Sequence, residues 1–102
     1  MIHVIAVITA QPGQRDALLA AFNANVPAVR AEAGCIEYGA AVDVVGGPAF
    51  QAAFGPDAFV VIEKWESMQA LGAHAVAPHM VDYGRKTKAM VADRKIHILQ
   101  PA

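Results

Sequence analysis

The chain of 102 residues has one cysteine, no excess of positive charge and no long apolar run. Cys35 cannot form an internal disulfide, and it lacks the Cys or His spacing of a zinc site. Eight Lys and Arg against nine Asp and Glu leave a formal net charge of -1, so no counterion release favours a nucleic acid as partner. These deficits argue against a disulfide-stabilised secreted protein and a nucleic-acid-binding protein. A reducing cytoplasm fits best.

No segment has the pattern of a signal peptide or a membrane span. The apolar residues 2–8 have no basic residue ahead of them and are too short for either role. Gln11-Pro12-Gly13 then ends the apolar run with a turn. We therefore interpret this segment as a β-strand and expect no association with a membrane.

The hydrophobic pattern predicts one α+β domain over residues 1–102. Residues 2–9, 35–44, 59–66 and 95–99 have the composition and alternation of strands. A helix is predicted after Pro12-Gly13, with an apolar stripe at Leu18, Phe22, Val26 and Val29. Further helical stretches follow Ser67 and begin again at Pro78. The order β-α-β-β-α-β is that of a ferredoxin-like antiparallel sheet with both helices on one face.

Two helices leave one face of such a sheet without cover. The first and third predicted strands are apolar on both faces, with Ile5 and Val7 opposite Val4 and Ile8 on the first. Hydrophobic residues make up 56% of the chain, so this face needs a partner. We expect a homodimer in which the open face meets a second copy.

Glu63 is the most informative carboxylate in the sequence. The strand alternation places it between Val61 and Trp65 on an otherwise apolar face, where an unpaired charge is costly. It therefore needs a partner. A pocket histidine, the substrate, Arg30 and a backbone group all remain open as that partner.

Four segments in this order and spacing resemble the antibiotic-biosynthesis monooxygenase family, and most closely its small quinol-monooxygenase-like members. They are Gln11-Pro12-Gly13, the run RAEAGCIEY over residues 30–38, the run EKWES over residues 63–67, and His74 through Pro78-His79. The resemblance implies a dimeric α/β-barrel with one pocket per subunit, between sheet and helices. It also implies, as in several members, oxidation of an electron-rich phenol or quinol by O2 without metal or flavin.

The resemblance also suggests roles for individual residues. His74 is the candidate catalytic base, and Tyr38, Glu63, Trp65 and His79 are candidates for substrate binding. Each also has a structural alternative: His74 could hold a carbonyl, Tyr38 could pack at the dimer face, and Trp65 could belong to the core. The haem-degrading branch of the family is excluded, since Ala6 stands near its Asn position and no histidine lies between residues 79 and 97.

Two other functions remain open. In the first, the same scaffold isomerises a small phosphorylated hydroxy-dione, with Arg85, Lys86 or Lys88 turned inward to hold the phosphate. In the second, the chain is a non-catalytic dimeric ligand-binding or stress-response domain.

His3 and His97 lie on strands that should be neighbours, but they lack the carboxylates of a metal site. The apolar loop 45–58 contains the spacing of one helical turn at Phe50 to Phe54.

Overall fold

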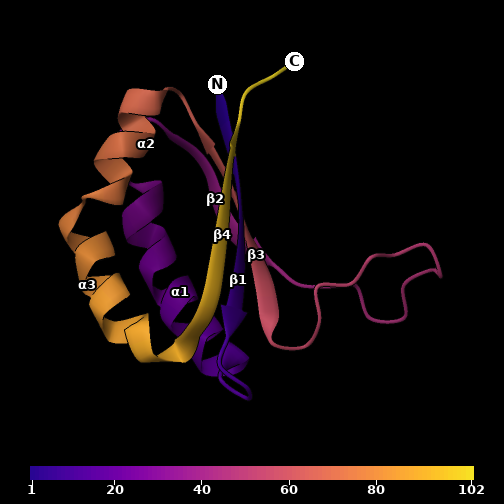
Figure 1. The fold of residues 1–102 in the computed structure, drawn as a ribbon. Helices are drawn as coiled ribbons and strands as arrows, with labels where there is room; N and C mark the ends of the chain where they lie inside the picture. Colours follow the sequence, from indigo (N-terminus) through magenta and orange to yellow (C-terminus); the bar gives the residue numbers. More distant parts are fainter.

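The computed structural model describes residues 1–102 and has a four-stranded antiparallel sheet with its helices on one face (Figure 1). The sheet order is β2-β3-β1-β4, which is the predicted ferredoxin-like α+β arrangement. The strands are β1 (Ile2–Ala10), β2 (Cys35–Ala41), β3 (Ala58–Trp65) and β4 (Val91–Leu99). The helices are α1 (Arg15–Arg30), α2 (Met68–Ala75), α3 (Pro78–Thr87) and the short 3-10 helix η1 (Lys88–Met90). None of the helices is long and apolar enough to cross a membrane.

Local sequence signals explain where the second helical region begins and divides. The Ser67 side chain accepts a hydrogen bond from the Ala70 backbone N–H at 3.1 Å, which caps the N-terminus of α2. Pro78 occupies the first turn of α3, where its missing N–H breaks no helical bond. The residue before a proline disfavours helical angles, and Ala77 is extended here. The chain therefore forms two helices, α2 and α3, with His74 and His79 on either side of the break.

The core lies between the helices and one face of β1 and β3. The predicted stripe of α1 is buried as expected, at Leu18, Phe22, Val26 and Val29. Phe22 stands at the centre, with its ring 5.2 Å from that of Tyr38 and 5.7 Å from that of Phe59. Such aromatic pairs add to the stabilisation from buried apolar area.

The second and fourth strands differ from prediction at their ends. The chain leaves β2 after Ala41 rather than Val44, and β4 begins at Val91 rather than Lys95. The register of β2 against β3 also shifts between Cys35 and Glu37, which makes Ile36 an extra residue in a bulge. Ile36 is half exposed, whereas Tyr38 two residues later is buried.

The loop between β2 and β3 extends away from the sheet, on the side that carries no helix (Figure 1). The predicted helical turn at residues 50–54 is absent. Gly46 and Gly55, on either side of these residues, adopt positive φ angles of 70° and 104° and turn the chain there. Asp43 closes the base of the loop, because its carboxylate accepts hydrogen bonds from the backbone N–H groups of Phe54 (3.0 Å) and Gly55 (2.9 Å). These bonds lower the pKa of Asp43.

The face of the sheet opposite the helices is apolar at its centre. Paired residues of an antiparallel sheet share a face, so the pairing places Ile5, Val7, Val60 and Ile62 together there. Glu37 and Lys64 form an ion pair of 3.3 Å on the same face. No helix of the chain covers this face (Figure 1).

Leu18→Ala tests the core under α1. Leu18 is fully buried, so we expect the free energy of unfolding to fall by about 2–5 kcal/mol, as is typical of core leucines. Val81→Ala is the control, because Val81 is 52% exposed on α3 and its loss should cost no more than about 0.5 kcal/mol. Urea unfolding followed by circular dichroism measures both, and equal losses would contradict this account of the core.

Candidate active site

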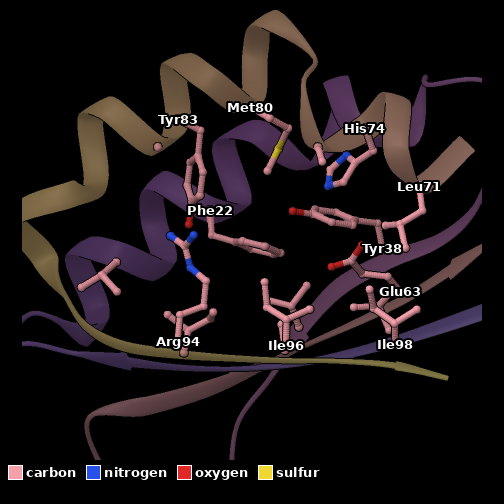
Figure 2. A pocket seen from close by; sticks show the side chains of 17 residues that line it. Phe22, Tyr38, Glu63, Leu71, His74, Met80, Tyr83, Arg94, Ile96 and Ile98 are labelled. Atoms are coloured by element: carbon pink, nitrogen blue, oxygen red, sulfur yellow. The ribbon is translucent and has the colours of Figure 1, made fainter. Parts of the chain in front are cut away.

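A cavity of about 340 Å³ lies between the sheet and the helices (Figure 2). Of its 17 lining residues 13 are hydrophobic, so it suits an apolar ring with few polar groups. The residues with functional polar groups are Tyr38, Glu63, His74, Tyr83 and Arg94. The edge strand β4 contributes Ile96 and Ile98 to the wall, and both are half exposed because the cavity is open on this side.

His74 lies in the last turn of α2 and its ring is buried against the cavity wall. The ring packs on Trp65, with centroids 4.6 Å apart, and meets Tyr38 edge to face at 5.4 Å. Its Nδ1 atom is 2.9 Å from Oε2 of Glu32. A carboxylate only accepts hydrogen bonds, so this contact places the proton of the neutral ring on Nδ1. The Nε2 atom has no partner in the protein and is left as the basic nitrogen.

Glu32 is the residue that connects the two histidines. It follows α1 in the turn before Gly34, and only 13% of its side chain is exposed. The same Oε2 atom lies 2.7 Å from Nε2 of His79. His79 is 30% exposed and borders a separate groove between α1 and α3. A continuous set of hydrogen bonds therefore runs from the cavity to the surface through Glu32.

Tyr38 on β2 and Glu63 on β3 are paired residues of neighbouring strands. Both side chains point toward His74 on α2 (Figure 2). Oε1 of Glu63 accepts a hydrogen bond of 2.8 Å from the indole N–H of Trp65, so its protein partner is none of the groups considered from the sequence. Arg30 instead donates from Nε to the Tyr38 backbone carbonyl at 3.1 Å. Burial raises the pKa of Glu63, against the opposing effects of the Trp65 bond and of His74.

The Tyr38 hydroxyl is available to a ligand. Burial, and secondarily the charge of Glu63, raise the pKa of Tyr38 well above its ordinary value. The phenol is therefore a neutral hydrogen-bond donor, and no protein group accepts its proton. It can donate to an oxygen bound in the cavity.

The structure brings three of the five predicted site residues to the cavity, namely Tyr38, Glu63 and His74. Trp65 and His79 do not line it. Trp65 is fully buried and supports His74 and Glu63 from behind. His79 is connected to the cavity only through Glu32 and His74. Sequence reasoning missed Glu32, whose only signal was its place in the run RAEAGCIEY. It also missed Tyr83 and Arg94.

The other candidate site residues that were considered from the sequence do not line the cavity. His97 pairs with Ile5, so it is on the sheet face opposite the cavity, as is His3. Arg85, Lys86 and Lys88 do not line the cavity, and Lys86 forms a surface ion pair of 3.0 Å with Asp82. No group of three His, Cys, Asp or Glu side chains is arranged to hold a metal ion.

The sheet order, the helices over one face and the cavity between these layers define a ferredoxin-like α+β protein with a ligand pocket. The family model for antibiotic biosynthesis monooxygenase matches residues 1–86. The chain belongs to this family.

The relatives span nearly the whole chain. It is 45% identical over 103 residues to the Escherichia coli (strain K12) protein named "Probable quinol monooxygenase YgiN", covering 99% of this chain and 98% of that protein. Among solved structures, PA3566 from Pseudomonas aeruginosa matches with a TM-score of 0.82 and 32% identity, over 99% of this chain and 93% of that one. Rv0793 from Mycobacterium tuberculosis matches with a TM-score of 0.80 and 26% identity, over 99% and 94% of the two chains.

Glu63→Gln tests the effect of burial on this carboxyl. The folded state holds the Glu63 proton more tightly than the unfolded chain does, so ionisation costs stability as the pH rises above the ordinary pKa of 4.5. Glutamine keeps an acceptor for Trp65 without the charge. We expect the variant to be more stable than the parent at about pH 7.5, with the difference shrinking toward about pH 4.

Thermal unfolding at both pH values measures this difference. Glu66→Gln is the matched control, because Glu66 is exposed and its substitution should not reproduce the trend. A Glu63→Gln effect that is the same at both pH values would contradict the raised pKa.

Proposed function

We propose that this chain is a monooxygenase that oxidises a small quinol or a related electron-rich phenol with O2, without metal or flavin. The observation that carries the proposal is His74, which Glu32 holds with Nε2 as the free nitrogen at an apolar cavity. The name of the Escherichia coli relative supports a quinol as substrate. A monocyclic or bicyclic aromatic suits a cavity of about 340 Å³.

The first step is removal of a proton from the substrate. Nε2 of His74 accepts the proton of a substrate hydroxyl, which leaves an oxyanion on the ring and an imidazolium on His74. The Glu32 carboxylate, 2.9 Å from Nδ1, stabilises this imidazolium. His79 shares the same carboxylate oxygen and leads toward the groove between α1 and α3. The Glu32 carboxylate is thereby held between the two imidazole rings.

The substrate anion then supplies the electrons. It passes one electron to O2, and recombination of the substrate radical with superoxide forms a bond between a ring carbon and oxygen. Loss of water from the resulting hydroperoxide gives a hydroxyquinone, so one quinol and one O2 become one hydroxyquinone and one water. The Tyr38 hydroxyl and the protonated form of Glu63, which burial favours, donate hydrogen bonds to the oxyanion.

The isomerase alternative is less well supported. A phosphorylated substrate needs cations at the cavity. The Arg85, Lys86 and Lys88 side chains that were considered for this role do not line it, and Arg94 is the only Lys or Arg that does. The non-catalytic alternative predicts binding without turnover, which the next experiment separates from catalysis.

His74→Ala tests the proposed base. The metal-free protein should consume O2 with methylhydroquinone faster than buffer alone, and the variant should lose about a hundredfold to ten-thousandfold of this excess rate, the range typical of a general base. An oxygen electrode measures both, with the buffer rate subtracted. Equal rates for parent and variant would remove His74 from the mechanism.

Two further variants show whether Glu32 acts through His74. Glu32→Gln keeps the size of the side chain but replaces the carboxylate that accepts from both histidines. Its loss of rate should be smaller than that of His74→Ala, because the imidazole is still present. Glu66→Gln makes the same change on the surface and should keep the parent rate.

We also propose that the chain works as a homodimer. The open sheet face is apolar at Ile5, Val7, Val60 and Ile62, and the neighbouring loop exposes Val45 and Phe50 at 98% and 90%. Exposed apolar area of this kind is typical of a protein interface. A second copy of the same face is complementary to it in chemistry, and its Glu37 and Lys64 pairs would lie in the polar surround.

Ile62→Lys tests this dimer. Light scattering should give the parent a mass twice the 10.7 kDa of one chain, and a charge at the centre of the face should shift the variant to the mass of one chain. Met68→Lys is the control, because Met68 is 54% exposed on α2, in the helical layer. A parent protein with the mass of one chain would contradict the dimer.

A further inference from the structure

Arg94 brings a positive charge to the cavity at a place that neither the sequence motifs nor the family match includes. It lies on β4, beyond the matched residues 1–86. Its pairing partner on β1 is Ile8, whose side chain is buried under the helices, so Arg94 is on the same face. It lines the cavity, is exposed to solvent at its open side, and forms no ion pair or side-chain hydrogen bond within the chain. An unpaired guanidinium in a ligand cavity is available to an anion.

Tyr83 adds a second polar group beside Arg94. The ring of Tyr83 descends from α3 and its hydroxyl lies next to the guanidinium (Figure 2). Burial raises the pKa of Tyr83, and the charge of Arg94 opposes this rise, which is consistent with their closeness. A neutral phenol can donate a hydrogen bond to the same anion that the guanidinium binds.

The opposite end of the cavity has the reverse character. His74, Glu63 and Tyr38 are grouped there, away from Tyr83 and Arg94 (Figure 2). The Glu32 carboxylate behind His74 opposes a permanent negative charge at that end, and burial favours the neutral form of Glu63 there. Apolar side chains such as Phe22, Met80 and Ile96 separate the two ends. A ligand with one apolar ring and one anionic group therefore has a preferred orientation.

We propose that Arg94 and Tyr83 form a subsite for a carboxylate, and that the substrate is a quinol or phenol carrying a carboxylate-bearing substituent. The inference rests on the proposed function, because it directs the reacting hydroxyl to His74 and the carboxylate to the other end. One guanidinium matches one planar carboxylate with two parallel hydrogen bonds. A phosphate monoester would keep one negative charge without a partner, since Arg94 is the only Lys or Arg that lines the cavity.

Anaerobic calorimetry tests the subsite without requiring turnover. The probes are 3-(2,5-dihydroxyphenyl)propanoate and its methyl ester, which differ in charge but share the quinol ring. The parent protein should bind the acid about tenfold to a hundredfold more tightly than Arg94→Gln does, the range of a hydrogen bond to a charged group. The affinity for the ester should change less than about threefold. Arg94→Lys should recover part of the affinity for the acid.

Arg85→Gln is the matched control, because Arg85 is exposed on α3 and does not line the cavity. It should bind both probes like the parent. Equal affinity of the parent for the acid and the ester would overturn the carboxylate subsite. So would an Arg94→Gln variant that loses affinity for the acid and for the ester to the same extent. Oxygen consumption by the same two quinols in air is a separate measurement. Binding that follows this pattern without turnover would overturn the proposed function and leave the subsite intact.

Discussion

The contact on which the site depends is the one between the Glu32 carboxylate and two histidines. A single oxygen receives His74 Nδ1 at 2.9 Å and His79 Nε2 at 2.7 Å. Without this acceptor His74 could adopt either tautomer and turn either nitrogen to the cavity. With it, the nitrogen that faces away from Glu32 is the basic one. The turn after α1 thus determines the chemistry of a ring on α2 that is 42 residues away in sequence.

Trp65 supplies the second constraint on the same ring. Its indole packs against His74 on one side and donates its N–H to Glu63 on the other. A fully buried indole cannot move without opening a cavity in the core, so both polar groups are held by packing as well as by hydrogen bonds. The surrounding wall is apolar, which strengthens each electrostatic contact by keeping water away. The polar groups then have well-defined positions relative to a bound ring.

The fold was largely predictable because it depends on periodic patterns. The stripe Leu18, Phe22, Val26 and Val29 is the buried side of α1, and the alternation that singled out Glu63 is the buried face of β3. The site was less predictable. The hydrogen-bond partners of Glu63 and His74 are set by the three-dimensional packing, which the hydrophobic periodicity of the sequence does not describe. Glu32 had no pattern of its own, and only the fold brings it to His74.

Arg94 was missed for a related reason. The predicted last strand began at Lys95, so the alternation that places Arg94 on the cavity side was never applied to it. The loop 45–58 and the bulge at Ile36 were also unpredictable, because both depend on local backbone geometry at a few residues. An error at the start of one strand therefore concealed the position of Arg94, although the four strands themselves were correctly predicted.

The most direct test of the role of Glu32 is the tautomer of His74, read from its two ring nitrogen-15 chemical shifts by NMR in the ligand-free protein. Donation to the Glu32 carboxylate predicts a protonated Nδ1 and an unprotonated Nε2 when the ring is neutral. Glu32→Ala, which leaves no side-chain acceptor at Nδ1, should remove this preference. A neutral His74 with its proton on Nε2 in the parent protein would contradict the account, because the nitrogen at the cavity could then accept no proton from a substrate.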